Sequence, residues 1–496
     1  MLTGALRDDG WRWRLARGTR AALGVVALAA LGVALARAPL TWCVALIGGG
    51  VGAVLLFRWP WLGLCGLAFS VPFGSLRELA LGGVTIGASE LLVLGTVSAW
   101  ILRRLATRQV RLARTRLLWG VVCYIAALGV GLLPAGQLAP ALKELAKWAE
   151  IALLLVLMAS ELQPAQQRGL VAALLLGGAL QAALGVYQFL FQVGPAGFVL
   201  FGRYMRAHGT FQQPNPFAGY LGLLLPLGYG VALTGASDAL RGWRAGQGRH
   251  AHYGPTLWWV FVVACTTVMA AGLVMSWSRG ALMGLAAGAA LVLAAMGRRA
   301  AVAVALLAVV GVLVAPALAG GVSSDLTDRL MGSLSLTGGI DLAAVEVDDA
   351  NFASVERLAH WQAAWRMFEQ RPWTGVGTGQ YAAVYSSVAM PRWQDPLGHA
   401  HNYYLNVLAE TGLVGLAGYA AFVWAVLTTA WRGARRGSGW SRALGLGALG
   451  MLGHLLVHSL VDNLYVHEMY LVVALILGLA MHMTTKQPMK VKANST

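Results

Sequence analysis

Charged residues are scarce in this 496-residue chain. Asp, Glu, Lys and Arg make up 11% of it and hydrophobic residues 58%, whereas soluble domains average about 25% charged residues. This composition excludes an ordinary cytosolic enzyme and a disordered protein. The apolar stretches are continuous rather than alternating, which also excludes an outer-membrane β-barrel. The class that remains is an all-α, polytopic integral membrane protein.

Cysteine is scarce as well. The four cysteines, Cys43, Cys65, Cys123 and Cys265, all lie in apolar stretches. They suggest neither a disulfide framework nor a zinc site. We expect them to be small core residues.

The membrane spans follow from length and hydropathy, since a spanning helix needs roughly 20 predominantly apolar residues. About 14 stretches qualify: 20–36, 40–57, 59–76, 84–102, 117–134, 140–160, 169–192, 215–234, 256–276, 280–296, 300–318, 403–430, 443–463 and 465–483. Because the first few are short and rich in glycine, about 12–14 transmembrane helices are expected. We predict one transmembrane domain, residues 1–496, into which a long loop with short helices is inserted at residues 319–400.

Positive charge dominates, with 37 Lys and Arg against 20 Asp and Glu and a net charge of +17. Such an excess can indicate nucleic-acid binding. Basic residues also accumulate on the cytoplasmic side of membrane proteins. With a cytoplasmic N-terminus and alternating spans, most of the basic residues fall on that side. The pattern therefore predicts cytoplasmic N- and C-termini, no nucleic-acid partner, and an external loop 319–400.

Several arginines fall at the external ends of spans. Arg279 lies between two apolar runs that would make a single helix of about 60 Å, so the chain must turn there. It is either a snorkelling arginine or a ligand for a phosphate group. Arg203 and Arg206 precede Asn215, an expected helix cap, and Pro216. Two arginines beside a helix N-terminus suit an anion, and a plain structured loop is the alternative.

His401 opens the span at 403–430. A helix N-terminus disfavours the imidazolium form, so a neutral imidazole can serve as general base. A histidine that only caps or packs is the alternative. The glycines at alternate positions in residues 375–379 could form an amide nest for an anion.

Two patterns could bind a metal ion. His454 and His458 are four residues apart, with Asp462 one turn further, although buried polar residues also serve as interhelical hydrogen bonds. Glu346 and Asp348 form an acidic pair that we interpret as solvated charge. We predict no metal site.

A transporter is the alternative from another functional class. Transporters place ionisable residues near the membrane midplane, and Glu90, Lys147, Glu150 and Glu410 are candidates. Lys147 and Glu150 could neutralise each other. No internal repeat is evident, and the arginines gather at one face, so a transporter is not favoured.

Four segments resemble the O-antigen ligase family. His401-Asn402, nine residues, Gly412, two residues and Gly415 match its histidine signature. Ser278-Arg279-Gly280 is similar to its Ser-Arg-Gly step. Arg357, with Trp361 and residues 372–377, resembles its external-loop motif, and residues 209–216 resemble the preceding loop. The likeness covers residues 200–465.

The resemblance implies a glycosyltransferase of the bacterial inner (cytoplasmic) membrane with a periplasmic active site. Its donor would be a glycan on undecaprenyl diphosphate, and its acceptor a lipid A-core sugar or another glycan, alongside membrane lipids. Transfer would invert the anomeric carbon without metal or other cofactor. His401 would be the base, Arg279 and Arg357 would bind diphosphate, and Arg203, Arg206, Asn215 and Asn402 would contact substrate.

The acceptor separates three activities that share this core. Ligases use lipid A-core, repeat-unit polymerases of O-antigen or exopolysaccharide use another lipid-linked glycan, and protein O-oligosaccharyltransferases use Ser or Thr. The histidine signature favours a ligase, with a polymerase as the main alternative.

Overall fold

A computed structural model describes the fold at residues 39–74, 78–81, 84–108, 115–200, 202–244, 253–297 and 352–481, and at positions 25–26, 302 and 347. The chain forms two compact units, residues 1–59 and residues 60–496. In the first unit, the helix α2 (Leu40–Arg58) coincides with the span predicted at 40–57.

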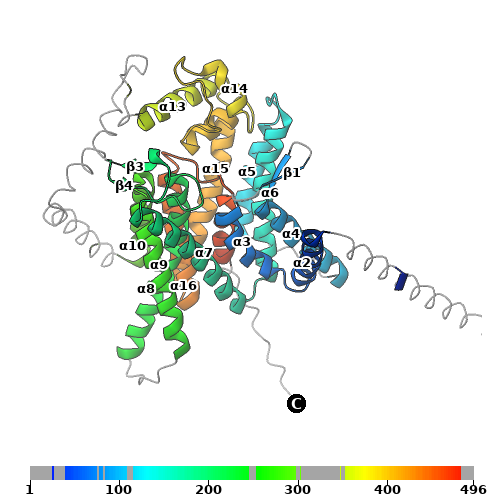
Figure 1. The fold of residues 1–496 in the computed structure, drawn as a ribbon, viewed down its shortest axis with the longest axis vertical. Helices are drawn as coiled ribbons and strands as arrows, with labels where there is room; N and C mark the ends of the chain where they lie inside the picture. Colours follow the sequence, from blue (N-terminus) through cyan, green and yellow to red (C-terminus); the bar gives the residue numbers. More distant parts are fainter. Residues whose placement is uncertain are drawn as a thin grey trace, which may run out of the picture. The chain divides into compact units, whose positions relative to one another are not determined.

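The second unit is built almost wholly of helices (Figure 1). They are α3 (Trp61–Gly74), α4 (Ala88–Thr107), α5 (Arg116–Val130), α6 (Leu138–Glu161), α7 (Pro164–Leu190), α8 (Pro214–Arg244), α9 (Tyr253–Met275), α10 (Arg279–Met296), α13 (Phe352–Gln370), α14 (Tyr381–Val388), α15 (Tyr403–Arg436), α16 (Gly439–His458) and α17 (Met469–Met481), with a 3₁₀ turn η1 (Ala196–Phe198). Two antiparallel hairpins pair β1 (Glu78–Leu81) with β2 (Val84–Gly87), and β3 (Val199–Leu200) with β4 (Tyr204–Met205).

Five helices in the described ranges are long and apolar enough to cross a membrane: α7, α8, α9, α10 and α15. Four shorter apolar helices accompany them, within α2, α3, α5 and α17. The predicted all-α, polytopic membrane fold is thus confirmed. Of the predicted spans, 20–36 and 300–318 lie outside the described residues except at positions 25–26 and 302. The described part of the loop 319–400 carries the short helices α13 and α14.

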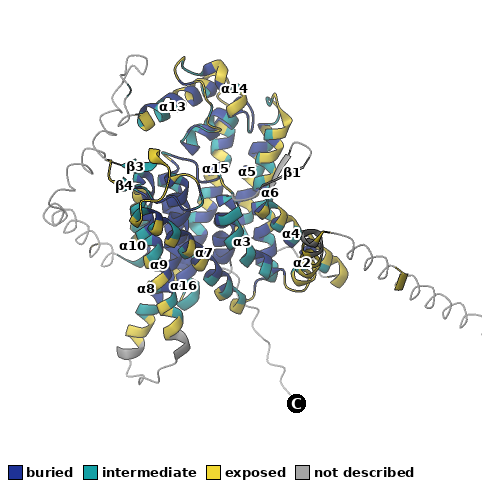
Figure 2. Ribbon diagram, in the orientation of Figure 1, coloured by how far each residue is buried: buried dark blue, intermediate teal, exposed yellow. Residues whose placement is uncertain are grey.

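Buried residues gather in the interior of the second unit (Figure 2), and they include most of α16 and all of α17. Every residue of α17 is buried, and α16 packs against α8, α10 and α15. A helix that is apolar all round can be stable only when protein or lipid surrounds it. These two helices therefore form the scaffold on which the outer helices are arranged.

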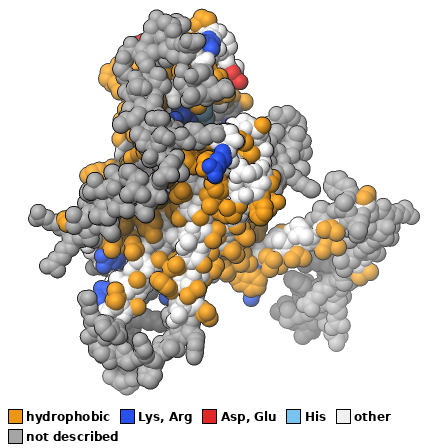
Figure 3. Space-filling view, turned by 60° about the vertical axis from the view of Figure 1, so that its left-hand side comes forward, with side chains coloured by type: hydrophobic (Ala, Val, Ile, Leu, Met, Phe, Trp, Pro, Cys, Tyr) orange, Lys and Arg blue, Asp and Glu red, His pale blue; other side chains and the backbone are white. Residues whose placement is uncertain are grey.

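Hydrophobic side chains are exposed on the flank of the bundle (Figure 3). Trp119 and Trp424 are 65% and 66% exposed. In water, apolar exposure on this scale would be a liability, but in a bilayer it is the contact surface for lipid.

The candidate intramembrane charges have partners within the protein. Lys147 pairs with Glu144 at 2.5 Å rather than with Glu150, so the predicted Lys147–Glu150 pair is wrong. Glu150 instead accepts a hydrogen bond from the Tyr470 hydroxyl at 2.7 Å. Glu90 accepts one from the backbone at the start of its own helix.

Several loops meet at one end of the bundle, which we call the loop end. The Tyr403 amide donates to the Ser459 carbonyl, joining the start of α15 to the loop between α16 and α17. The Ala207 amide donates to Met275 at the end of α9. The Thr378 amide donates to Gly131 in the turn between α5 and α6. Segments far apart in sequence, all predicted to be external, therefore lie together.

Candidate active site

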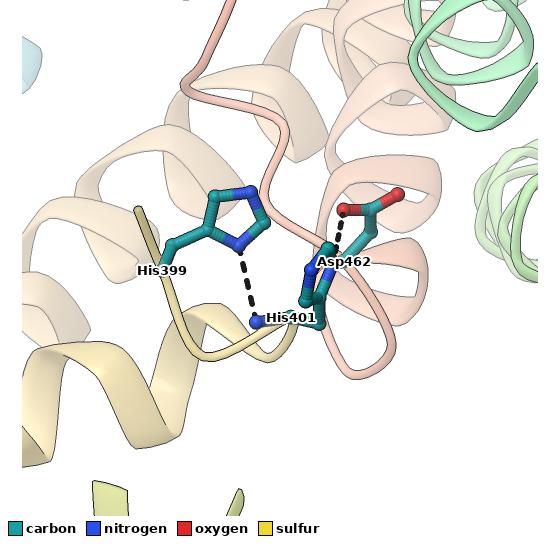
Figure 4. A group of neighbouring side chains, drawn as sticks. All are labelled: His399, His401 and Asp462. Atoms are coloured by element: carbon teal, nitrogen blue, oxygen red, sulfur yellow. Dashed lines mark hydrogen bonds and ion pairs between the residues drawn. The ribbon is translucent and has the colours of Figure 1, made fainter. Parts of the chain in front are cut away.

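A histidine and a carboxylate face each other at the loop end (Figure 4). His401 Nδ1 lies 3.6 Å from Asp462 Oδ1. Burial alone would raise the pKa of Asp462. His401, His458 and Arg357 together lower it by more than burial raises it, so the pKa lies below its ordinary range. Asp462 is therefore an anion at neutral pH. Both ring nitrogens of His401 are buried and make no hydrogen bond among the described residues; Nδ1 faces the Asp462 carboxylate, and Nε2 is the nitrogen left for a substrate.

The backbone at His401 has an unusual conformation. Its φ is +49°, in the left-handed region that a non-glycine side chain seldom adopts. Asn402 follows as the helix cap, and its side chain accepts from the amides of Tyr404 and Leu405 at 3.0 and 3.1 Å. Asn402, which was predicted to contact substrate, thus holds the start of α15 through its side-chain Oδ1, directly after His401.

Two further histidines surround His401. The His401 amide donates to His399 Nδ1 at 3.1 Å, and the His360 ring lies edge-on to His401 with centroids 5.7 Å apart. Burial, together with His401 nearby, lowers the pKa of His399 to about 3 and that of His360 to about 4. Both neighbours are therefore neutral at pH 7 and add no positive charge beside His401.

The helix α13 brings Arg357 to this centre. Arg357 is half-buried, its Nε makes no hydrogen bond among the described residues, and its charge acts on both Asp462 and His458. One turn along, the Trp361 indole donates to the His401 carbonyl at 3.4 Å. A buried guanidinium nitrogen without a partner is costly, and an anionic ligand would satisfy it.

Arg279 begins α10 beside the same loop. A Cβ at the next residue, Gly280, would lie 2.8 Å from the His458 ring and 2.7 Å from Val461. Only glycine allows α10 to start so close to the loop that carries Asp462. The predicted Ser-Arg-Gly step thus has a packing reason, and Arg279 is carried to the same end of the bundle as His401.

The remaining predicted anion site is only partly assembled. Arg206 donates to the Ser276 carbonyl at 2.8 Å and to Asn215 Oδ1 at 3.0 Å, so these side chains do meet. Asn215 is not the cap that was predicted, because α8 already begins at Pro214. Arg203 is exposed, and its guanidinium lies 5.2 Å from the centre of the ring of the adjacent Tyr204.

The glycine-rich segment 375–379 binds a carboxyl group of the protein itself. The amides of Gly379 and Tyr381 donate to the two carboxylate oxygens of Glu410, each at 3.1 Å. The amide of Gly377 donates to the Glu410 carbonyl at 2.9 Å. The prediction of a nest open to a ligand is therefore wrong at these amides, because an internal carboxylate occupies them.

The signature glycine Gly412 lies opposite this segment. Its φ of +61° interrupts α15, and a Cβ there would lie 2.4 Å from the Trp373 carbonyl carbon. The amides of Leu413 and Val414, freed by the kink, donate to the carbonyls of Pro372 and Trp373. The backbone amides just after the kink are thus paired with carbonyls that precede the glycine-rich segment, and the Glu410 carbonyl before the kink accepts the Gly377 amide.

One described group has the composition of a metal site. Ligand atoms of His399, His401 and Asp462 lie within 4.8 Å of one another, and two imidazoles with a carboxylate can bind zinc or iron. His399 Nδ1, however, already accepts the His401 amide. His454 and His458 contact each other directly, with Nε2 and Nδ1 3.3 Å apart. Of the pair Glu346 and Asp348, neither lies in the described ranges.

Sequence reasoning named Asp462 only beside His454 and His458, as part of a possible metal pattern and not as the partner of His401, and it did not identify His399 or His360 as site residues. A signal existed for Asp462, which is a lone acid at the external end of the penultimate span. A signal also existed for His399, two residues before a candidate base. His360 lies on a helix whose buried face cannot be read without its partner α14.

Comparison with known families bears on this arrangement. A model of the family described as O-antigen ligase matches residues 264–420. The matched segment contains Arg279, Arg357 and His401, whereas Asp462 and Arg206 lie outside it. No curated protein matches the chain.

Proposed function

We propose that this protein is a membrane glycosyltransferase that acts as a ligase. The match to the O-antigen ligase family at residues 264–420 supports its assignment to that superfamily. The protein moves a glycan from undecaprenyl diphosphate to a hydroxyl of a lipid A-core sugar at the periplasmic face of the inner membrane. The observation that carries the proposal is the meeting of His401, Asp462 and Arg357 at the loop end.

The chemistry needs a base and a counter-charge. The acceptor oxygen attacks the anomeric carbon, the bond from that carbon to the diphosphate oxygen breaks, and the electron pair leaves with the diphosphate. Asp462 faces Nδ1 of His401 and favours a proton there, which leaves Nε2 to take the proton of the acceptor hydroxyl. Attack opposite the leaving group inverts the anomeric carbon.

The leaving diphosphate gains negative charge as its bond breaks. Arg357, with a buried Nε that lacks a protein partner among the described residues, and Arg279, at the start of α10, supply fixed positive charge for it. Preorganised cations of this kind can replace a metal ion in stabilising the transition state. Arg206 and Arg203 extend the same positive edge on the side of α8 and β4.

A reconstituted transfer assay tests the proposal. Full-length protein in liposomes receives undecaprenyl-diphosphate-linked glycan with and without lipid A-core. We expect glycan on lipid A-core with the native chain, and a loss of about 10²–10⁴-fold for His401→Ala, the usual contribution of a general base. Arg357→Ala should lose activity as well, whereas Arg392→Ala, at an exposed position of the same loop region, should retain it.

Each alternative activity has its own outcome. Longer lipid-linked glycan formed without lipid A-core would identify a polymerase, and glycan on a protein Ser or Thr would identify a protein O-oligosaccharyltransferase. Transfer that survives His401→Ala undiminished would refute the role of His401 in any of them.

A further inference from the structure

A cavity of about 210 Å³ opens at the loop end, next to the catalytic pair but distinct from it. It lies between α5, α6, the first turns of α15 and the loop between α16 and α17. The polar side chains that line it and carry the argument are Lys143, Glu144, Lys147, His399, Asn406 and Asn463. None of the arginines proposed for the diphosphate lines it.

The cavity reaches the catalytic pair through neighbouring residues. His399 lines it, and the His399 and His401 rings have centroids only 4.3 Å apart. Asn463 lines it too, and directly follows Asp462. A ligand in the cavity therefore lies one side chain away from the proposed base.

His399 offers a hydrogen to such a ligand. Its Nδ1 accepts the His401 amide at 3.1 Å, so that nitrogen carries a lone pair. Since an imidazole ring carries at least one N–H, the hydrogen of His399 is on the other nitrogen, Nε2. His399 is therefore a hydrogen-bond donor that fits a hydroxyl oxygen, rather than a second base.

The charges that line the cavity are already matched. Lys147 and Glu144 form an ion pair, and the Glu410 carboxylate accepts two backbone amides. Lys143 is exposed. A cavity without a free buried charge does not suit a diphosphate, but carboxylate, ammonium and amide groups side by side suit hydroxyls, which both donate and accept.

We propose that this cavity binds the acceptor, and that Glu144, Lys147 and His399 hold the hydroxyls of one neutral sugar so that another hydroxyl faces His401. The assignment deepens the proposed function and rests on it for the identity of the acceptor. The active centre then has two sides, with the donor diphosphate at the arginines and the acceptor sugar in the cavity. His401 and Asp462 lie between them.

Steady-state kinetics separate the two sides. In liposomes containing the full chain, Glu144→Gln should raise the KM for lipid A-core at least tenfold and leave the KM for the lipid-linked donor within twofold. Glu161→Gln is the matched control, because Glu161 lies at the other end of α6 and pairs with Arg104 at 2.8 Å. An unchanged acceptor KM, or a change confined to the donor KM, would overturn the assignment.

The role of His399 has a finer test. His399→Gln keeps a side-chain N–H, so its KM for the acceptor should stay close to the native value. His399→Phe has no such donor, and its KM for the acceptor should rise about tenfold. Both should leave the donor KM unchanged. A fall in kcat of equal size for both variants, with the acceptor KM preserved, would show that His399 acts only on the conformation of His401.

A binding measurement keeps the cavity separable from the reaction. Delipidated core oligosaccharide is titrated into the full chain in nanodiscs, and undecaprenyl diphosphate is titrated separately. We expect the native chain and His401→Ala to bind the oligosaccharide, and Glu144→Gln to bind it at least tenfold more weakly. Absence of binding to the native chain refutes the cavity. Binding without any transfer refutes the proposed reaction but retains the cavity.

Discussion

Replacing Asp462 by Asn removes a negative charge from beside His401 and changes little else in shape. With 3.6 Å between Nδ1 and the carboxylate oxygen, a full imidazolium and a carboxylate attract by about 4–5 kcal/mol at an effective dielectric constant of ~20. If the imidazole carries about half a charge in the transition state, the loss is about 2 kcal/mol. Because each 1.4 kcal/mol is a factor of ten, Asp462→Asn should lower kcat by about 30-fold.

The assay is single-turnover transfer with both substrates saturating, so that chemistry rather than binding is measured. The double variant Asp462→Asn/His401→Ala is the control. If Asp462 acts through His401, the double variant should be no slower than His401→Ala alone. An equal loss from Asp462→Asn in both backgrounds would refute the coupling, and so would a native rate for the single variant.

Four further predictions follow from the same geometry. Because burial lowers the pKa of His360 to about 4, the unfolded state binds more protons than the folded state between about pH 6.5 and pH 4. The free energy of unfolding should therefore fall by up to about 3 kcal/mol as the pH is lowered from about 6.5 to about 4. His360→Gln should make the free energy of unfolding depend less on pH in this range. Gly412→Ala combines a left-handed φ with a backbone clash at 2.4 Å and should lower the melting temperature measurably, whereas Gly129→Ala, with open space around it, should not. Arg357→Lys keeps the charge but loses the fork of donors, so its donor KM should rise about tenfold. Chelation with EDTA should leave the transfer rate unchanged, and a rate restored only by added zinc would instead indicate a metal at His399, His401 and Asp462.

The sequence predicted the fold class, and it predicted that distant residues lie on one side of the membrane, for a simple reason. Spans alternate across a membrane, so loops assigned to one side must share one face. Arg279, Arg357 and His401 are 122 positions apart from first to last by their residue numbers, yet all belong to loops or helix ends of the loop end. The family match at residues 264–420 covers three of the four segments that had suggested it, and residues 209–216 lie outside the match.

The finer assignments failed where a tertiary partner decides the outcome. Residues 375–379 have the glycines of an amide nest, but no local pattern shows that Glu410, some thirty positions later, already supplies the anion. Lys147 has carboxylates three residues away in both directions, and only the fold selects Glu144. Asn402 caps the helix that follows it through its side-chain oxygen, and its contact with substrate stays a prediction.

The first turns of α15 connect these observations. His401 precedes the helix, Asn406 lines the cavity, and Glu410 anchors the glycine-rich segment, all before the kink at Gly412. The kink lets this short stretch leave the axis of the long membrane helix, and the carbonyls of the loop satisfy the amides it exposes. The spacing from histidine to glycine in the signature is therefore the length of the segment 401–412. This segment carries the base at one end, and backbone hydrogen bonds to Pro372 and Trp373 hold its other end. Any substitution that straightens the kink should move His401 relative to both the arginines and the cavity, so its effect on transfer should exceed its effect on folding.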